Sequence, residues 1–297
     1  MLGSSSLHGK TIIITGAGSG IGLETALGLA SKGAALVIVD VDRGRGESAI
    51  ERIERNGPSP RLFLADLSVQ AEVRRVAGEI LAATPRIEVL INNAGAMFMT
   101  RHETVDGLER TLALNHLGYF LLTNLLLDRI IASAPARIVS VSSRAHRFEA
   151  LDFDDLQKKQ NYSGQAAYFR SKLANVLFTR ALAKRLCGTG VTANAAEPGW
   201  GMVLTNFFHS AGWETAPEHV ARATTAAEGA KTSIYLASSS EVDGVNGQYF
   251  ADCQAIAPAD AALDEAAAER LWAESVQLCG LTPERAFGSE GGHLYRY

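Results

Sequence analysis

Short apolar runs alternate with longer amphipathic segments along most of this chain, and this alternation restricts the possible folds more than any other feature. The short runs are rich in β-branched residues and apolar at consecutive positions, as parallel strands covered on both faces are. Repeated strand–helix units predict an α/β fold with a single doubly wound parallel sheet, flanked by helices on both faces. The predicted strands are Thr11–Thr15, Ala35–Asp40, Arg61–Leu64, Val89–Asn92, 138–142 and 191–195, and the predicted helices include 21–31, 69–82, 168–186 and 259–274.

Composition narrows the class of protein further. We expect one domain over residues 1–297, because the predicted linkers are short turns. The 28 Lys and Arg against 32 Asp and Glu lack the basic excess of a nucleic-acid-binding protein. The cysteines (Cys187, Cys253, Cys279) are too scattered for a disulfide framework or a metal site. Residues 1–10 lack the apolar core of a signal peptide, and no stretch approaches the roughly 20 apolar residues of a membrane span. We therefore expect a cytoplasmic protein.

A glycine-rich turn joins the first predicted strand to the first predicted helix. Its sequence is Thr15-Gly16-Ala17-Gly18-Ser19-Gly20-Ile21-Gly22. Glycines at such a turn let the backbone approach a pyrophosphate, which then lies at the positive end of the helix. A tight turn without a ligand is the alternative, but the strand before it and the helix after it favour a Rossmann-type dinucleotide site. The expected contacts are Gly16, Ser19, Gly20, Ile21 and Gly22.

An acidic residue at the end of the second strand bears on which dinucleotide binds. Asp40 lies 18 residues after Gly22, where a carboxylate can accept hydrogen bonds from the adenosine ribose. The same carboxylate repels a 2′-phosphate, and Val41 offers no positive charge to bind one. The sequence therefore predicts NAD as the cofactor. Arg43 and Arg45 are close enough to keep NADP open as the alternative.

A tyrosine and a lysine stand four residues apart in a predicted helix. Tyr168 and Lys172 therefore project from one face, and an ammonium beside a phenol is expected to lower the tyrosine pKa from ~10 toward the working pH. Such a pair suits general acid–base chemistry. Tyr162 lacks this partner, because Ala166 stands four residues after it.

Together these features resemble the short-chain dehydrogenase/reductase superfamily, over about residues 8–255. Thr15–Gly22 is similar to its TGxxxGxG motif. Six further motifs follow in the family's order: Asp66-Leu67, Asn92-Asn93-Ala94-Gly95, Asn115, Ser142-Ser143, Tyr168-Phe169-Arg170-Ser171-Lys172 and Pro198-Gly199.

The resemblance implies roles for the catalytic residues. Tyr168 would exchange a proton with the substrate oxygen, and Ser143 would hydrogen-bond that oxygen. Lys172 would also hold the nicotinamide ribose, and Asn115 would anchor a water in the relay to Lys172. Ser143 is preferred to Ser142 by the family pattern alone, since either hydroxyl could cap the strand end.

The resemblance also implies cofactor contacts outside the glycine turn. Asp66 and Leu67 would frame the adenine, and Asn93 would support the cofactor ribose and the central strands. After the sixth strand, Thr205 would contact the nicotinamide carboxamide and the Val203 backbone would lie nearby. Pro198 and Gly199 complete the expected cofactor contacts.

Ser143 and Tyr168 lie 25 residues apart, and the sequence between and after them looks like the retinol dehydrogenase-like branch, whose members oxidise or reduce lipophilic alcohols and carbonyls. Three features depart from that branch. Asp40 stands where the branch favours a basic residue and NADP, and Glu197 replaces the histidine usual before Pro-Gly. The branch's N-terminal membrane-anchoring segment is not found in this sequence.

Large apolar residues gather where a substrate would enter. Residues 199–225 are expected to form a lid over a bulky hydrophobic substrate, with Met97, Phe98 and Met99 on the same side. Ordinary packing of the lid or a subunit contact is the alternative. His146 and Arg147 are expected to be solvated loop residues, and contact with a polar group of the substrate is the alternative. The lid contributes Trp200, Met202, Val203, Leu204, Phe207, Phe208 and Trp213.

A leucine-rich helix bears on assembly. Its apolar residues cover more than one face, which predicts burial on two sides. Dimerisation through this helix and the Tyr168 helix would resemble the superfamily's habit, so a homo-oligomer (dimer or tetramer) is expected, and a densely packed monomer core is the alternative. The tail 288–297 is expected to be mobile or to close over a neighbour. The apolar set is Leu121, Leu122, Leu125, Leu126, Leu127, Ile130 and Ile131.

The sequence thus predicts an NAD-dependent alcohol dehydrogenase that interconverts a secondary alcohol and a ketone of a bulky hydrophobic compound, of terpenoid, steroid or polyketide type. Two alternatives remain open: an NADPH-dependent ketoreductase of a similar substrate, and an NAD-sensing binding protein without turnover.

Overall fold

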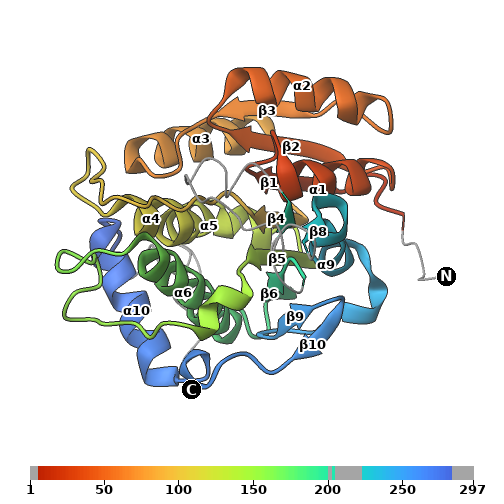
Figure 1. Cartoon of the computed structure of the whole chain (residues 1–297). Coiled ribbons are helices and arrows are strands. Elements are labelled where there is room, and N and C mark those ends of the chain that lie inside the picture. Colours follow the sequence, from red (N-terminus) through yellow and green to blue (C-terminus); the bar gives the residue numbers. More distant parts are fainter. Residues whose placement is uncertain (1–5, 200–202, 205–222, 283–297) are drawn as a thin grey trace.

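One eight-stranded sheet organises the protein, as the computed structural model shows (Figure 1). The structure describes residues 6–199, 203–204 and 223–282. The strand order is β10-β9-β6-β5-β4-β1-β2-β3, and neighbouring strands are parallel except for β10, which runs antiparallel to β9. The strands are β1 (Thr11–Thr15), β2 (Ala35–Asp40), β3 (Arg61–Leu64), β4 (Val89–Asn92), β5 (Ala136–Val141), β6 (Val191–Glu197), β9 (Tyr249–Ala251) and β10 (Gln254–Ile256). A separate two-stranded pair joins β7 (Val203–Leu204) to β8 (Thr224–Thr225).

Helices cover both faces, which confirms the predicted doubly wound α/β fold. The long helices are α1 (Gly20–Ala30), α2 (Arg43–Glu54), α3 (Gln70–Ala83), α5 (Gly118–Ile131), α6 (Gly164–Arg185), α9 (Ala226–Ser238) and α10 (Glu265–Leu278). Helices α1, α2 and α9 pack on one face of the sheet, and α3, α5, α6 and α10 on the other. Short turns of helix are α4 (Arg110–Leu112), the π-helix η1 (Ala113–Leu117), and the 3₁₀ helices η2 (Arg144–Arg147), η3 (Ser240–Val242) and η4 (Asp260–Ala262).

The element bounds differ from prediction where a cap decides them. Strands β1 to β4 have the predicted bounds, whereas β5 lies about two residues earlier than 138–142 and β6 runs two residues past Ala195. Helix α6 begins four residues before Tyr168, because the Ser163 side chain accepts the Ala166 N–H. The C-terminal helix begins later than expected, because Asp264 caps it by accepting the Ala267 N–H.

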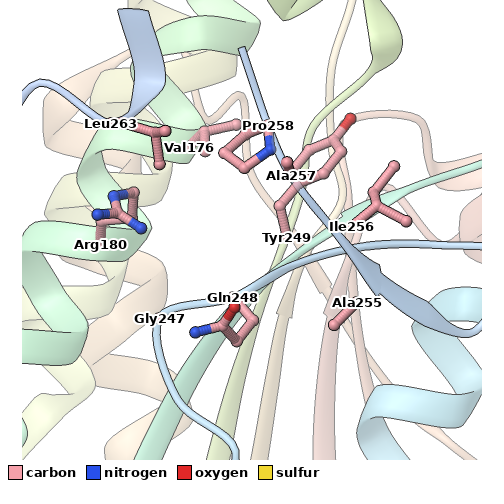
Figure 2. A pocket seen from close by; sticks show the side chains of 10 residues that line it. All are labelled: Val176, Arg180, Gly247, Gln248, Tyr249, Ala255, Ile256, Ala257, Pro258 and Leu263. Carbon is pink, nitrogen blue, oxygen red and sulfur yellow. The ribbon is translucent and has the colours of Figure 1, made fainter. Parts of the chain in front are cut away.

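The β9–β10 hairpin closes one edge of the sheet beside α6. A cavity of about 340 Å³ lies between this hairpin and α6, and Figure 2 shows its lining, from Val176 and Arg180 on α6 to Tyr249 on β9. Tyr249 is buried, and its phenol points away from Arg180 (Figure 2). The hairpin therefore brings a buried aromatic residue toward the carboxyl end of β6.

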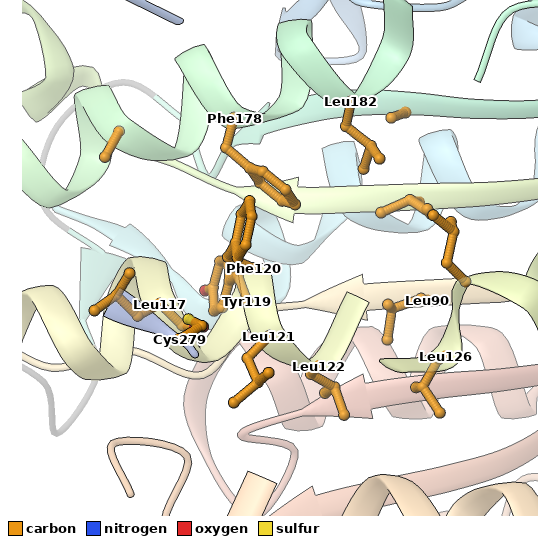
Figure 3. Packing of buried hydrophobic residues seen from close by; sticks show 14 of the residues in the cluster. Leu90, Leu117, Tyr119, Phe120, Leu121, Leu122, Leu126, Phe178, Leu182 and Cys279 are labelled. Atoms are coloured by element: carbon orange, nitrogen blue, oxygen red, sulfur yellow. The ribbon is translucent and has the colours of Figure 1, made fainter. Parts of the chain in front are cut away.

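The leucine-rich helix α5 is buried within a single chain. Leu121, Leu122, Leu126 and Leu127 belong to the core on this face of the sheet, and Phe120 packs against Phe178 of α6 (Figure 3). Helix α10, C-terminal to the rest of the fold, packs on α6 and so adds a third helical layer here (Figure 1). The apolar faces of α5 are thus accounted for by the monomer core, and the homo-oligomer stays a prediction.

Several expectations fall outside the described residues. The proposed lid, 199–225, is described only at 199, 203–204 and 223–225, and the tail 288–297 is not described. Among the described residues, no helix combines the length and the apolar character needed to cross a bilayer.

Candidate active site

A cleft of about 440 Å³ lies at the carboxyl ends of the central strands, where the strand order reverses between β1 and β4. Open α/β sheets bind ligands at this switch point, because the loops after the two strands diverge to opposite faces. Within the described residues the cleft gathers nearly every predicted site residue. Its lining includes Gly16, Ser19, Gly20, Ile21, Gly22, Asp40, Asp66, Leu67, Asn93, Ser143, Tyr168, Lys172, Pro198, Gly199 and Val203.

The glycine turn packs so closely against its own backbone and the loop after β4 that larger residues would not fit at two of its positions. Gly16 has φ +67°, and a Cβ there would lie 2.8 Å from the Ala94 Cα. A Cβ on Gly22 would lie 2.2 Å from the Gly16 carbonyl oxygen. Ser19 precedes α1 without capping it, and the first turn of α1 carries no acidic side chain. The positive end of α1 is therefore not neutralised by its own residues, which fits a bound pyrophosphate.

Asp40 lies against the glycine turn at the end of β2. Its Oδ2 accepts the Gly18 N–H at 2.8 Å and its Oδ1 accepts the Asp42 N–H at 3.0 Å. Arg45 also lines the cleft, 3.6 Å from the Asp40 carboxylate, whereas Arg43 pairs with Glu47. Asp40 keeps lone pairs for a ribose hydroxyl, and Arg45 places a positive charge next to them. The cleft thus contains one residue that favours NAD, Asp40, and one that favours NADP, Arg45.

Asn93 ties the ends of two central strands together. Its Nδ2 donates to the Thr15 carbonyl at 2.8 Å and to that of Gly16 at 3.2 Å. The Asn93 side chain therefore holds the end of β1 and the start of the glycine turn in place, as expected for a residue that stabilises the central strands. Asp66 accepts two bonds from Ser68 and lies 3.8 Å from Arg110.

Arg110 and Leu114 line the cleft but were not predicted from the sequence to be site residues. Arg110, at the start of α4, lines the cleft and lies over the Phe98 ring at 4.5 Å. Leu114 joins the same wall beside Met97 and Phe98, and Met99 is exposed outside it. These residues enter the cleft through the loop after β4 and the helix start that follows, which no local motif marks. Thr205, the expected carboxamide contact, lies outside the described residues.

The structure distinguishes the two serines after β5. Ser142 is buried, and its hydroxyl donates to the Lys172 carbonyl oxygen at 2.8 Å. Both serines border the cleft, but the Ser143 side chain accepts the Ala145 N–H at 3.2 Å and is hydrogen-bonded to the side chain of Tyr168. Ser142 therefore joins β5 to α6, and Ser143 is the serine whose hydroxyl can reach a ligand beside the tyrosine.

Burial dominates the titration of the tyrosine–lysine pair. Burial raises the pKa of Tyr168 to about 12, although the hydrogen bond from Ser143 lowers it in part. Burial also lowers the pKa of Lys172 to about 7. The Lys172 Nζ donates to the Val141 carbonyl oxygen at 3.2 Å and lies 5.6 Å from the Tyr168 ring centroid. The pKa of Tyr168 is therefore raised and not lowered as expected, because desolvation outweighs the Ser143 hydrogen bond.

Asn115 lies behind the cleft in the π-helix η1. Its Oδ1 accepts the Ala96 N–H at 2.9 Å, while its Nδ2 donates to the Ala96 carbonyl at 2.9 Å and to the Ser171 hydroxyl at 3.0 Å. A Cβ on Gly95 would lie 3.2 Å from this Oδ1 and 3.5 Å from the Lys172 Nζ. Asn115 and Lys172 thus approach the same backbone position, and the asparagine side chain is already engaged by protein groups.

His146 is not the solvated loop residue that the sequence suggested. It is 1% exposed, because η2 turns the chain inward after Ser143 and the C-terminal segment covers it. Arg147 does remain exposed, and its guanidinium donates to the Ala257 carbonyl oxygen. The described residues also contain no cluster of three or more side chains suited to holding a metal ion.

The chain is similar to several known proteins in sequence and in fold. Residues 10–214 match the short chain dehydrogenase family model. Human retinol dehydrogenase 14 is 43% identical, covering 93% of this chain and 88% of that protein. A crystal structure of an uncharacterised protein from Mycobacterium paratuberculosis matches with TM-score 0.77 and 34% identity, covering 94% of this chain and 96% of that one. A structure described as an NAD(P)-dependent gluconate 5-dehydrogenase from Beutenbergia cavernae, with bound NADP, matches with TM-score 0.67 and 30% identity over 83% of this chain and 96% of that one.

The motif order, the fold and these similarities agree, and the chain belongs to the short-chain dehydrogenase family, in its retinol dehydrogenase-like branch, as an oxidoreductase of the class that acts on alcohols.

Proposed function

We propose that the protein is an NAD-dependent dehydrogenase that interconverts a secondary alcohol and a ketone of a bulky hydrophobic substrate. One observation carries the proposal: Ser143, Tyr168 and Lys172 border the same cleft as the glycine turn and Asp40. Met97 and Phe98 give that cleft an apolar wall. The name of the human relative, retinol dehydrogenase 14, also indicates a lipophilic alcohol for that protein.

The proposed mechanism assigns proton transfer to the protein. The nicotinamide, when bound, accepts or supplies the hydride. The Tyr168 phenolate oxygen takes the proton from the alcohol in oxidation, and the Tyr168 hydroxyl gives a proton to the ketone oxygen in reduction. The Ser143 hydroxyl hydrogen-bonds the same substrate oxygen and orients it. Lys172 holds the cofactor ribose, close to Asn115 on one side and to Tyr168 on the other.

The cofactor contacts follow from the lining of the cleft. Gly16, Ser19, Gly20, Ile21 and Gly22 would hold the pyrophosphate at the start of α1, and Asp40 would accept the adenosine ribose hydroxyls. Contacts to the adenine and the nicotinamide halves would come from Asp66, Leu67, Asn93, Pro198, Gly199 and Val203.

A panel of alcohols tests the proposed substrate class. We expect NADH absorbance to appear with bulky secondary alcohols such as menthol or a 3-hydroxysteroid and to be weak with cyclohexanol, because the apolar wall favours larger ligands. The panel is run with NAD and with NADP. Faster turnover of cyclohexanol than of every bulky member would contradict the substrate class. Cofactor binding without any turnover would favour the binding-protein alternative.

Exchanging the residues at the end of β2 tests the cofactor. We expect Asp40→Ala combined with Val41→Arg to move the ratio of kcat/KM for NAD over NADP toward NADP by about tenfold or more, equivalent to about 1.4 kcal/mol. Because Asp40 also accepts the Gly18 N–H, affinity for both cofactors should fall, so the ratio is the quantity to measure.

Asp42→Ala is the matched control for the cofactor test. Asp42 caps α2 by accepting the Arg45 N–H, lies 3.9 Å from the Arg45 guanidinium and does not line the cleft, so its loss should move the ratio much less than the double variant does. A wild-type preference for NADPH of more than about tenfold would contradict the NAD assignment and favour the ketoreductase alternative, in which Arg45 binds the 2′-phosphate.

The raised pKa of Tyr168 sets a pH dependence. Oxidation needs the phenolate as base, and the tyrosine is protonated at neutral pH because burial raises its pKa to about 12. We expect kcat/KM for alcohol oxidation to rise by up to about tenfold per pH unit between about pH 6 and 9. Reduction, which needs the protonated phenol, should not rise over that range. Initial rates in both directions check this, and a flat oxidation profile would contradict it.

A further inference from the structure

A set of buried side chains lies directly behind the candidate catalytic serine. Ser143 begins the short helix η2, and its carbonyl oxygen accepts two bonds from His146: one from the backbone N–H at 3.0 Å and one from the ring Nδ1 at 2.8 Å. The other ring nitrogen, Nε2, accepts the Ala259 N–H at 2.9 Å. His146 thus links the serine to the segment that precedes α10.

The two bonds of the His146 ring determine its tautomer. A backbone carbonyl can only accept and a backbone N–H can only donate, so the proton must be on Nδ1 and the lone pair on Nε2. A protonated ring would face the Ala259 N–H with a second N–H and lose that bond. Burial also lowers the pKa of His146 to about 4, with the nearby Arg147 charge acting in the same direction. The ring is therefore neutral at physiological pH.

The His146 ring is held in place by an aromatic residue from the sheet edge. It packs against Tyr249 of β9 with ring centroids 4.6 Å apart. The Tyr249 hydroxyl donates to the Glu197 Oε2 at 2.5 Å. Figure 2 shows the phenol turned away from the α6 side of the neighbouring cavity, so its hydroxyl is free to bind Glu197 on the other side.

Glu197 connects this set to the part of the cleft lining that follows β6. It is the last residue of β6 and directly precedes Pro198 and Gly199, which line the cleft. Glu197 is buried at 3% exposure, and burial raises its pKa, whereas the Tyr249 hydrogen bond and the charges of Arg144 and Arg147 lower it. A buried carboxylate needs such a partner, so the Tyr249 hydroxyl fixes both residues.

We propose that His146, Tyr249 and Glu197 form a positioning network, the Ser143 support, which sets the place of the Ser143 hydroxyl relative to the cleft wall at Pro198–Gly199. The proposal rests on the proposed function, because it concerns how that site is oriented. None of the three residues lines the cleft, so they act through Ser143 and the Pro198–Gly199 turn. Glu197 stands where the related branch usually has a histidine, and its function in this network is to accept the hydrogen bond of the Tyr249 hydroxyl.

Two conservative replacements of His146 separate its two hydrogen bonds. An asparagine Nδ2 can occupy the place of the imidazole Nδ1 and still donate to the Ser143 carbonyl, whereas a glutamine reaches toward Ala259 instead. We expect His146→Gln to lower kcat by about 10- to 100-fold and His146→Asn by less than about threefold, since small displacements of a catalytic group have effects of this size. The cofactor Kd should change by less than about twofold in both, because the glycine turn is untouched.

Removing the Tyr249 hydroxyl tests the distal part of the Ser143 support. We expect Tyr249→Phe to lower kcat by about three- to tenfold, because the ring remains against His146 but Glu197 loses its donor. Tyr235→Phe is the matched control. Tyr235 lies on α9 and does not line the cleft, and the substitution removes a hydroxyl that donates to the Glu241 carboxylate at 3.0 Å. Its kcat should equal that of the wild type.

The measured quantity is kcat per cofactor site, with sites counted by NADH titration, together with the thermal midpoint. A merely structural role would lower the midpoint and leave kcat per site unchanged, and that result would overturn the proposal. Equal kcat for His146→Asn and His146→Gln, or a wild-type kcat in Tyr249→Phe, would do the same.

A measurement without turnover separates this inference from the proposed function. In ¹⁵N-histidine NMR spectra at pH 7, we expect the His146 signals, assigned by their loss in His146→Asn, to show a proton on Nδ1 and none on Nε2. A proton on Nε2 would overturn the Ser143 support even in an active enzyme. The expected tautomer in a protein that turns over no alcohol would support the network and contradict the proposed function.

Discussion

Replacing Tyr168 by phenylalanine is expected to lower kcat by about 10²- to 10⁴-fold, the usual contribution of a general acid–base group. The substitution removes only the hydroxyl that would exchange the proton with the substrate oxygen. The ring stays beside Lys172, and the Ser143 hydroxyl loses its hydrogen-bonded neighbour. Cofactor binding, measured by NADH titration, should remain largely intact. Turnover within about threefold of the wild type would contradict the proton-transfer role.

Tyr162 supplies the matched control for this experiment. Its hydroxyl donates to the Phe98 carbonyl oxygen at 2.9 Å and to the Glu109 carboxylate at 3.2 Å, and it does not line the cleft. Tyr162→Phe should therefore cost stability by about 1 kcal/mol, as lost hydrogen bonds do, and keep kcat near the wild-type value. The pair of variants separates loss of a hydroxyl in general from loss of the catalytic one.

Removing the Trp272 side chain is expected to lower the free energy of unfolding by about 3–5 kcal/mol. Trp272 of α10 is 7% exposed and lies edge-on to Phe120, with ring centroids 4.9 Å apart. It also stacks on Phe178 at 6.0 Å and lies beneath the Arg185 guanidinium at 4.0 Å. Truncation to alanine would leave a cavity between α10 and the α5–α6 pair, and the aromatic contacts would be lost with it.

Urea unfolding of Trp272→Ala, monitored by circular dichroism, measures this loss. Trp272→Phe is the comparison, because it keeps a ring against Phe120, and it should lose roughly half as much or less. A loss below about 1 kcal/mol for the alanine variant would contradict the view that α10 is part of the core. If the slope of the unfolding free energy against urea concentration is unchanged, the substitution has altered the stability of the protein and not the compactness of its unfolded state.

Much of the fold could be predicted from the sequence because its signals are local. The runs of β1, β2 and β4 are short, rich in β-branched residues and mostly buried, so even their ends could be predicted. Helix ends were less predictable where a side-chain cap decides them, as Ser163 does for α6 and Asp264 does for α10. A cap depends on one hydrogen bond, which apolar periodicity does not report.

The residues of the cleft were largely predictable for a related reason. Most of the cofactor residues and Ser143 follow a strand, and the carboxyl ends of parallel strands meet at one edge of the sheet. The positions of Gly16, Asp40, Asn93 and Ser143 after their strands were therefore enough to expect them in one place, whereas Tyr168 lies within α6 and was expected there from the family resemblance. Arg110 and Leu114 were missed, because they reach the cleft from the start of a helix that no strand end marks.

The sequence by itself determined the parallel sheet, the dinucleotide turn and the set of catalytic residue types, because strand pattern and motif spacing are properties of neighbouring residues. Only the tertiary structure decided the protonation of Tyr168 and Lys172, because desolvation depends on everything packed around them. It also decided that α10 covers the α5–α6 core, and that His146 lies behind Ser143 against a tyrosine about 100 residues away in the chain. Such contacts join distant segments, and packing alone brings them together.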